Sequence, residues 1–301
     1  MAAARSPLIS VAELAAIIDD PALVLLDVRW TLGQTDGRER YLEAHIPGAR
    51  FVDLDRELAD AASPARGRHP LPSREAFQRT LRGLGVTADS SIVVYDQAQS
   101  LSAARLWWLL RSAGFTSAAF GGPRIGGPGF GPIRGSVRVL DGGLDAWAAA
   151  DQELAVGNPR VTMPGDVTIE WGALPTIDID EAAAFAERGI LLDARAGERY
   201  RGEVEPMDPR AGHIPGALSA PTSDNVDASG AFLPADVLTA RFAELGVADS
   251  TPVAVYCGSG ITAAHEILAL EVAGRTAALF PGSWSQWSSD PERPAATGAT
   301  P

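Results

Sequence analysis

VAVYCGSGITAAHEILALEVAG, residues 253–274, contains the only cysteine of the 301-residue chain, Cys257. Four apolar residues precede the thiol, a glycine-rich turn follows it, and a helix-like stretch completes the segment. A strand, a tight turn and a helix N-terminus would surround the thiol with backbone N–H groups and the positive end of a helix dipole. We therefore expect a stabilised Cys257 thiolate that acts as a nucleophile. A buried structural cysteine is the alternative, since free cysteine is among the most buried residue types.

The same pattern occurs earlier in the chain, at a distance of roughly 165 residues, together with three other repeated segments. The pairs are LLDVRW (25–30) with LLDARA (191–196), EAHIPGARFVDLD (43–55) with RAGHIPGALSAPTSD (210–224), SIVVYDQAQSLSAARLWWLLRSAGF (91–115) with TPVAVYCGSGITAAHEILALEVAG (251–274), and VLDGGLDAW (139–147) with LFPGSWSQW (279–287). This period is far too long for a solenoid repeat. The shared order indicates two copies of one domain.

Short apolar runs alternate with helix-like stretches within each copy. The runs ALVLLDV, SIVVYD, GILLDA and PVAVYC resemble buried strands, and VAELAAII, REAFQRTLRGLG, ARLWWLLRSAG and DEAAAFAERG resemble helices. This alternation predicts an α/β fold of two tandem domains, each a mainly parallel sheet with helices on both faces. The expected division is a first domain at 1–150, a linker at 151–175, a second domain at 176–290 and a C-terminal tail at 291–301.

The two copies differ at the position that matters for chemistry. Asp96 stands in the first copy where Cys257 stands in the second, and both follow the carboxyl end of a strand, where open sheets bind ligands. The first copy also contains the Gly/Pro-rich stretch FGGPRIGGPGFGPIRG (120–135). We expect a long flexible surface loop there, because a phosphate-binding loop would need a lysine and a strand-to-helix context.

Composition excludes several classes of function. The net charge of −13 argues against nucleic-acid binding, and no uncharged apolar run is long enough to span a membrane. One cysteine permits neither an intramolecular disulfide nor a cysteine-rich zinc site, and a free thiol favours a reducing compartment such as the cytoplasm. All 25 basic residues are arginine, which excludes a Schiff-base lysine and a P-loop lysine.

With these repeats, the chain resembles a tandem-domain rhodanese-type sulfurtransferase over nearly all of residues 8–290. The motifs that carry the resemblance are HIPGA in both halves, YD followed by SAARLWW, DAR followed by ERYRG, CGSGIT and GSWSQW. In this family a catalytically silent N-terminal domain precedes the domain that carries the cysteine, and the active site lies between them. Asp96 fits the silent domain. The CGSG loop is similar to that of the 3-mercaptopyruvate branch, whereas thiosulfate-type loops place basic residues after the cysteine.

The resemblance also assigns site residues. Arg199 matches the arginine that both branches use to hold the donor, and the loop residues Gly258, Gly260, Ile261 and Thr262 line the donor site. The mercaptopyruvate branch has a second donor arginine in an EPR segment, where this chain has Met207. Arg210, three residues further on, is the candidate substitute. The mercaptopyruvate branch also has a serine–histidine–aspartate relay, which matches Ser259, His69 and Asp55. Each residue also has a structural alternative: Ser259 as a turn residue, His69 as a surface histidine and Asp55 as a carboxylate bonded to local amides.

The resemblance implies a sulfur transfer with no metal and no organic cofactor. Sulfur would pass from 3-mercaptopyruvate to a Cys257 persulfide and then to a thiol acceptor, such as thioredoxin or a low-molecular-weight thiol, or to cyanide. Closely packed tandem domains favour a monomer. Thiosulfate as the donor and a non-catalytic persulfide carrier remain open. A cysteine phosphatase is disfavoured, because Thr262 and Ala263 stand where it would need an arginine.

The other repeated polar residues are expected to be architectural, because one copy has them without a thiol. They are His45, His213, Asp27 and Asp193. His265 is expected to pack within its helix, and the tryptophans at 107, 108, 284 and 287 to lie in the core or at its rim.

Overall fold

Two short segments of this chain fold with the opposite half of the sequence. The computed structural model describes residues 6–117, 133–159 and 163–301. The first unit contains Met1–Leu58, Pro72–Leu174 and Ala228–Ala231, and the second contains Ala59–Leu71, Pro175–Asp227 and Phe232–Pro301. The Gly/Pro-rich stretch 120–135, for which we expect a surface loop, lies outside the described residues except for 133–135.

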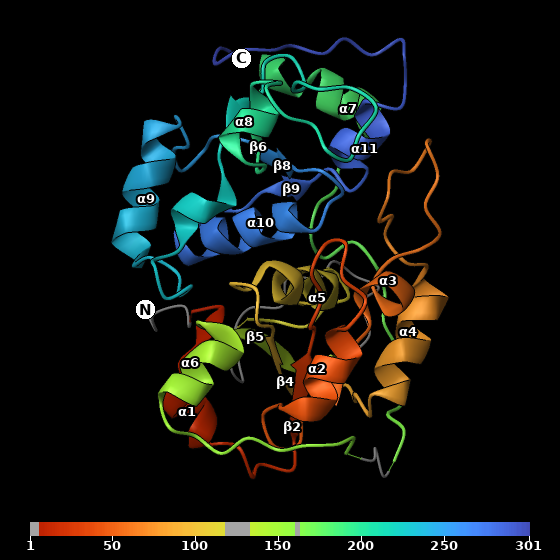
Figure 1. Cartoon of the computed structure of the whole chain (residues 1–301), viewed down its shortest axis with the longest axis vertical. Helices are drawn as coiled ribbons and strands as arrows, with labels where there is room; N and C mark the ends of the chain where they lie inside the picture. The colour runs from red at the N-terminus through yellow and green to blue at the C-terminus, as the bar shows by residue number, and fades with distance from the viewer. Residues whose placement is uncertain (1–5, 118–132, 160–162) are drawn as a thin grey trace. The chain divides into compact units, whose positions relative to one another are not determined.

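The first unit is built on a five-stranded parallel sheet of order β1-β5-β4-β2-β3. Its strands are β1 (Leu8–Ile9), β2 (Leu23–Asp27), β3 (Arg50–Phe51), β4 (Ser91–Tyr95) and β5 (Ser136–Leu140). Its helices are α1 (Val11–Ala15), α2 (Gly37–Glu43), α3 (Leu54–Glu57), α4 (Arg74–Gly83), α5 (Leu101–Ser112) and α6 (Gly143–Ala149). Helix α5 packs on β4 and β5 (Figure 1).

The second unit is built on a four-stranded parallel sheet of order β7-β6-β8-β9. Its strands are β6 (Ile190–Asp193), β7 (Leu218–Ser219), β8 (Val253–Tyr256) and β9 (Ala278–Leu279). Its helices are α7 (Ile179–Ala183), α8 (Gly197–Tyr200), α9 (Ala235–Glu244), α10 (Thr262–Val272) and α11 (Ser283–Trp287), with the 3-10 turns η1 (Phe185–Glu187) and η2 (Thr222–Asn225). Helix α10 packs on β8 and β9 (Figure 1).

The predicted α/β fold, with parallel sheets in two tandem domains, is confirmed. Some helix bounds differ from the sequence pattern. Helix α5 begins at Leu101, three residues before the apolar run that suggested it. The stretch 180–189 is not one helix, because Ala184 leaves helical geometry (φ −96°, ψ 0°) and divides it into α7 and η1.

A tyrosine at the end of the central strand fixes the HIPG turn in each unit. The Tyr95 hydroxyl accepts a hydrogen bond from the Ile46 N–H, and the Tyr256 hydroxyl accepts one from the Ile214 N–H, both at 3.1 Å. The histidine of each turn is buried and stacks on a tyrosine: His45 on Tyr41 and His213 on Tyr200. Each ring also uses Nδ1 to contact that tyrosine's carbonyl. These contacts give the repeated histidines an architectural role.

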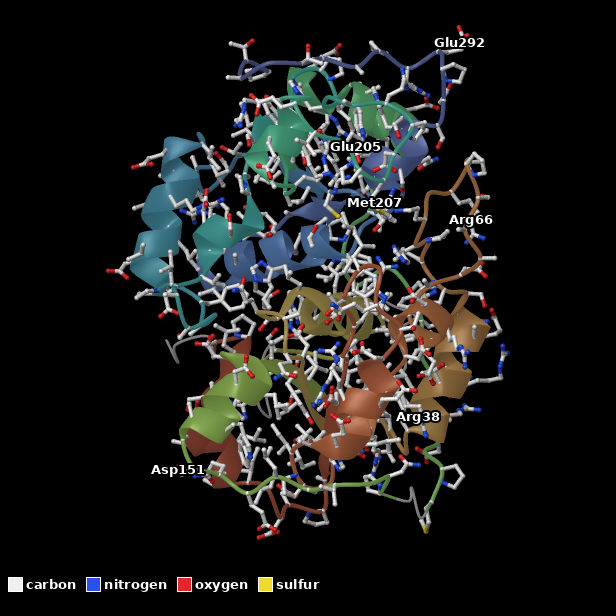
Figure 2. The ribbon with its side chains drawn as sticks, in the orientation of Figure 1. Arg38, Arg66, Asp151, Glu205, Met207 and Glu292 are labelled. Atoms are coloured by element: carbon white, nitrogen blue, oxygen red, sulfur yellow. The ribbon has the colours of Figure 1, made fainter. Side chains whose placement is uncertain are left out.

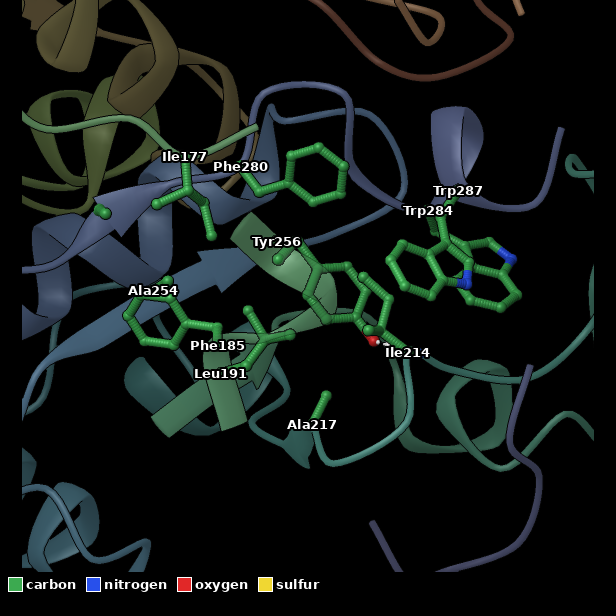
Figure 3. Packing of buried hydrophobic residues seen from close by; sticks show 12 residues of the cluster. Ile177, Phe185, Leu191, Ile214, Ala217, Ala254, Tyr256, Phe280, Trp284 and Trp287 are labelled. Atoms are coloured by element: carbon green, nitrogen blue, oxygen red, sulfur yellow. Dashed lines mark hydrogen bonds between the residues drawn. The ribbon is translucent and has the colours of Figure 1, made fainter. Parts of the chain in front are cut away.

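An aromatic cluster packs against the strand that leads to Cys257 (Figure 3). Tyr256, Trp284 and Trp287 are at most 1% exposed, and Figure 3 shows the two indoles together at one end of the cluster. The burial of each of these side chains stabilises the folded state by about 2–3 kcal/mol through the hydrophobic effect. The cluster therefore fixes the end of β8, and with it the backbone that carries the thiol.

The expected linker and tail both pack on a unit. In the first unit, Arg82 Nε donates to the Val167 carbonyl (2.8 Å), so residues near 167 are part of that unit. In the second, the His213 and Ala296 backbones form a bridge and Trp287 Nε1 donates to the Pro294 carbonyl (2.8 Å). Within the described ranges, no helix combines the length and apolar character needed to cross a bilayer.

Candidate active site

Cys257 lies at the point where β8 turns into α10. Its side chain is buried, with 1% exposure, and its Sγ accepts the N–H of Gly260 at 3.1 Å. Gly260 has φ +80°, and a Cβ on it would lie 2.6 Å from the Pro281 carbonyl oxygen. Only glycine therefore fits this turn, and the turn directs an amide N–H at the sulfur.

A neighbouring loop holds the backbone of the cysteine. Ser283 Oγ accepts the Cys257 N–H (3.1 Å) and donates to the Phe280 carbonyl (2.9 Å), while the Trp284 N–H donates to the Cys257 carbonyl (2.9 Å). Ser283 has φ 53°, a left-handed conformation that a non-glycine residue rarely adopts. Sequence reasoning missed Ser283. The signal was the replacement of Gly143, which has φ +59° in the first copy, by a serine in the second.

In the first unit, the Asp96 carboxylate occupies the corresponding turn. Both of its oxygens accept hydrogen bonds from the loop that leads into α5. The donors are the backbone N–H groups of Ala98 (2.8 Å), Ser100, Ser102 and Ala103 (each 2.9 Å) and the Ser102 hydroxyl (2.9 Å). The turn between the central strand and the helix is thus an anion cradle, and the first unit fills its cradle with its own carboxylate.

The remaining loop positions line the same turn in the second unit. Ile261 is 2% exposed and precedes α10, and Thr262 is the first residue of that helix. In the alignment of the two repeats, Ser259, Ile261, Ala263 and Ala264 correspond to the four residues whose N–H groups bind Asp96. Their amides are therefore the expected donors to an anion on Cys257.

The structure brings two of the three predicted relay residues together. His69 Nδ1 lies 2.8 Å from Ser259 Oγ, within hydrogen-bond distance. Both residues belong to the second unit, although His69 comes from the first half of the sequence. Asp55 lies in α3 of the first unit, where its Oδ2 accepts the indole N–H of Trp30 at 3.0 Å. Its part in the relay stays a prediction.

Two arginines lie beside the residue that follows the thiol. A Cβ built on Gly258 would lie 3.0 Å from Nη2 of Arg68 and 3.4 Å from Nη1 of Arg199. Asp208 forms ion pairs with both guanidinium groups, and Glu205 forms one with Arg199 at 2.7 Å. Burial raises the pKa of Asp208 above its usual value, and the charge of Arg68 opposes that rise. The sequence predicts a donor-binding role for Arg199, which stays a prediction, and it did not single out Arg68.

The expected second donor arginine is absent from its loop. Met207 is 45% exposed, and its N–H donates to Glu205 at 3.1 Å; Figure 2 labels both residues. Arg210, the candidate substitute, forms its hydrogen bonds with another part of the second unit. Its guanidinium donates to four backbone carbonyls at and after the end of α11: those of Ser288 (2.9 Å), Arg293 (2.7 Å), Trp287 (3.0 Å) and Asp290 (2.6 Å). We therefore leave Arg210 out of the proposed donor site.

We expect Arg210→Met to lower stability and leave donor binding unchanged. Loss of the guanidinium leaves four carbonyls without their donor, so the free energy of unfolding should fall by about 2–3 kcal/mol. The KM for the sulfur donor should stay within about twofold. Urea unfolding and steady-state kinetics measure the two effects, with Arg201→Met, an exposed arginine paired with Glu203, as the matched control. If the Arg210→Met variant were as stable as the wild type but had a raised KM for the donor, Arg210 would belong to the donor site after all.

The other repeated polar residues form buried pairs. Asp27 contacts Arg29 at 2.7 Å, and Asp193 contacts Arg195 at 2.6 Å. Burial raises the pKa of Asp27 to about 6, against the opposing charge of Arg29. His265 is buried and stacks on Phe232, as expected for a packed helix residue. Of the residues that the structure describes, no group of three or more His, Cys, Asp or Glu side chains is arranged to hold a metal ion.

The structure thus shows a tandem α/β protein with one buried cysteine at a strand-to-helix turn, and with Asp96 at the corresponding turn of the first unit. The family model for the rhodanese-like domain matches residues 10–150 and 178–290. The chain belongs to the rhodanese family and contains two rhodanese-like domains.

Several similar proteins have names that describe sulfur transfer. The chain is 42% identical to a putative thiosulfate sulfurtransferase, SseB, of Mycobacterium tuberculosis, over 99% of both proteins. It is also 42% identical to a probable 3-mercaptopyruvate sulfurtransferase of Pseudomonas aeruginosa, over 97% of this chain and 98% of that protein. Among solved structures, SseA of Escherichia coli, a 3-mercaptopyruvate sulfurtransferase, matches with a TM-score of 0.76 at 33% identity, over 93% of this chain and 99% of that one.

Proposed function

We propose that this protein is a sulfurtransferase that moves a sulfane sulfur from 3-mercaptopyruvate, through a persulfide on Cys257, to a thiol or cyanide acceptor. The observation that carries the proposal is the contact between His69 and Ser259, two residues from a thiol in an anion cradle. This pair can supply a proton beside the reacting sulfur. The M. tuberculosis, P. aeruginosa and E. coli relatives support sulfur transfer as the reaction class.

In the first half-reaction, the Cys257 thiolate attacks the sulfur of the donor. An S–S bond forms and the C–S bond breaks, with its electron pair leaving on the enolate of pyruvate. The proton that the donor thiol carried ends on the enolate carbon, which gives pyruvate and the Cys257 persulfide. Ser259 and His69, with Asp55 as the predicted third member, would stabilise the enolate and move this proton.

The anion cradle would stabilise the persulfide. Its outer sulfur is negatively charged and extends from Sγ toward the amides of the loop, beyond the N–H of Gly260 that already contacts Sγ at 3.1 Å. The Asp96 carboxylate in the first unit supports this assignment, because it is an anion held by the corresponding amides. Preorganised donors of this kind stabilise charge at little reorganisation cost.

In the second half-reaction, an acceptor thiolate or cyanide attacks the outer sulfur and Cys257 leaves as the thiolate. Suitable acceptors are a small thiol or the exposed thiol of a protein such as thioredoxin. Because donor and acceptor react in turn with one sulfur on the enzyme, we expect ping-pong kinetics. A reactive free thiol survives in a reducing environment, so we place the protein in the cytoplasm.

Thiosulfate is the second candidate donor, favoured by Met207 in place of the expected arginine. The local charge favours 3-mercaptopyruvate. Residues 258–262 carry no charge, and the charges of Arg68 and Arg199 are balanced by those of Glu205 and Asp208. A site with no net positive charge stabilises the single charge of a carboxylate at lower cost than the two charges of thiosulfate.

The ratio of kcat/KM for the two donors tests this choice. We expect the value for 3-mercaptopyruvate to exceed that for thiosulfate by at least about tenfold, with cyanide as the common acceptor. A higher value for thiosulfate would reverse the donor assignment. Persulfide formation without turnover to cyanide or to any small thiol would instead identify a sulfur carrier.

A further inference from the structure

Helix α10, which begins directly after the Cys257 turn, is buried along most of its length. Its residues from Ala263 to Leu270 are all buried, and the helix packs on β8, β9, α9 and η2. Apolar packing is non-directional, so it buries such a helix without fixing its position along and about its axis. That position matters, because the amides at the start of α10 are the expected donors to an anion on Cys257. Directional contacts are therefore needed to fix where these amides point.

Glu266 provides contacts of this kind. Its side chain is fully buried, and each carboxylate oxygen accepts one hydrogen bond: Oε1 from Nη1 of Arg241 (3.0 Å) and Oε2 from Nδ2 of Asn225 (2.6 Å). Arg241 belongs to α9, which packs on α10 (Figure 1), and Asn225 belongs to η2. Burial raises the pKa of Glu266, and the charge of Arg241 and the hydrogen bond from Asn225 oppose that rise. The carboxylate thus joins α10 to two other elements of the same unit.

Both partners of Glu266 are themselves held in place. Arg241 Nη2 donates to the Pro221 carbonyl at 3.0 Å. The Asn225 carbonyl accepts the N–H of Leu233 at 2.9 Å, which closes the hairpin that follows η2. Because these groups have little freedom, hydrogen bonds to them fix the position of Glu266 and with it the position of α10.

The neighbouring residue on α10 contacts the same hairpin. The ring of His265 stacks on Phe232, with 4.6 Å between the ring centroids, and Phe232 forms a backbone bridge with Val226. Val226 directly follows Asn225 in the chain. Two consecutive residues of α10 therefore hold opposite sides of one hairpin.

The first copy anchors its helix at the equivalent position. In the alignment of the two repeats, Glu266 corresponds to Arg105 of α5, which is also fully buried and whose Nη2 donates to the Leu58 carbonyl (3.2 Å). The sign of the charge is reversed between the copies. A buried polar contact with a segment outside the helix is common to both, which favours a role through position over a role through charge.

We propose that Glu266 is a positioning residue for sulfur transfer: through Asn225 and Arg241 it fixes α10 so that the amides at the start of the helix point at Cys257. This inference deepens the proposed function and rests on it, because it assumes that Cys257 reacts as a thiolate held by those amides. Buried polar contacts are best known for this use, fixing the register of packed helices.

The charges around Glu266 allow position and charge to be separated. Arg241 balances the carboxylate, and the exposed Asp224 of η2 lies 4.0 Å from that arginine. Strands β8 and β9, which also pack on α10, have the sequences VAVY and AL and carry no charge at neutral pH. A neutral residue in place of Glu266 leaves the positive charge of Arg241, which would favour the thiolate. Loss of position would disfavour the thiolate, so the two effects have opposite signs.

Glu266→Leu and Glu266→Gln test the inference. Leucine accepts neither hydrogen bond, so we expect the pH midpoint of Cys257 ionisation to rise by about 0.5–1 unit, which lowers the thiolate fraction below the midpoint about 3- to 10-fold. Glutamine can accept the Arg241 hydrogen bond and, with the Asn225 amide turned over, donate to Asn225 Oδ1, a buried oxygen to which the described residues offer no hydrogen bond. Its midpoint should stay within about 0.3 unit of the wild-type value. The ultraviolet absorbance of the thiolate measures the midpoint, with Cys257→Ser as the baseline, because the chain has one cysteine.

The rate of persulfide formation should follow the thiolate fraction. In single turnovers with 3-mercaptopyruvate, Glu266→Leu should be about 3- to 10-fold slower below the midpoint and should recover most of its rate above it. Leu270→Ala is the matched control, because Leu270 is fully buried on the same helix and its truncation lowers stability without removing a polar contact. Its midpoint should match the wild type. If Glu266→Leu does not fold, Asn225→Ala replaces it, with a smaller rise expected from the loss of one contact.

The outcomes separate the two proposals. An unchanged midpoint in Glu266→Leu, or in Asn225→Ala where the leucine variant does not fold, refutes the positioning role. An equal shift in the leucine and glutamine variants would also refute it, as an effect of charge, and so would an equal rise in Leu270→Ala, as an effect of stability alone. If the wild type ionises but forms no persulfide with 3-mercaptopyruvate or thiosulfate, the proposed function fails, while the midpoints still test the role of Glu266.

Discussion

Cys257→Ser should abolish sulfur transfer. Incubation with 3-mercaptopyruvate or thiosulfate should add about 32 Da to the wild-type protein and nothing to the variant, because a serine hydroxyl cannot form a persulfide. We expect kcat to fall by at least about 10⁴-fold, as for removal of other covalent nucleophiles. Intact-mass spectrometry measures the adduct, and cyanide-dependent turnover measures the rate. Since the chain has one cysteine, no second thiol can carry the sulfur.

The fold of the variant provides the control. Cys257 is 1% exposed and serine is nearly the same size, so the unfolding midpoint should stay close to the wild-type value. If the variant is folded and forms no adduct, the loss of the adduct results from the missing thiol and not from unfolding. An undiminished adduct on Cys257→Ser, or no adduct on the wild type from either donor, would refute the proposed mechanism.

Asp96→Ala should destabilise the first unit by about 3–5 kcal/mol, the largest stability effect that we expect from a single substitution in this chain. The change removes the acceptor for four backbone N–H groups and one hydroxyl. Asp96 is 1% exposed, so water cannot easily replace the carboxylate. Urea unfolding measures the loss, and hydrogen exchange of α5 should report where it occurs.

Two further variants sharpen this prediction. Asp96→Asn keeps the shape but presents an NH₂ group to donors, so it should also be destabilised. Asp89→Ala removes an exposed carboxylate that pairs with Arg134 on the surface, and it should change stability by less than about 0.5 kcal/mol. If Asp96→Ala and Asp89→Ala were equally stable, the cradle would not need its internal anion.

Most of the fold could be predicted from local patterns. The strand that ends at Cys257, the glycine turn and helix α10 follow one another in sequence, and each depends on residues a few positions apart. The repeat then predicted two domains of one kind and explained why Asp96 stands in the cysteine position of the first. Short strands such as β3 and β7 have two residues each, too few to give a pattern.

The donor site was harder to predict. Arg199 is predicted from its motif. Arg210 was a reasonable substitute for the missing arginine by distance along the chain, yet its guanidinium turns to the carbonyls after α11. Nothing in the local sequence distinguishes Arg68 from the other arginines of its segment. Only the fold brings it beside Gly258 and into an ion pair with Asp208, two residues that are far from it along the chain.

The sequence alone determined the class of fold and predicted the nucleophile and the silent copy, because these depend on short-range order and on a repeat that can be read directly. Only the tertiary structure decided which residues surround Cys257. Residues 59–71 leave the domain of their own repeat and join the second unit, where the Arg68 N–H binds Ser285, 217 positions away. Such a contact is set by backbone geometry at Gly67 and by hydrogen bonds that form only when distant segments pack together.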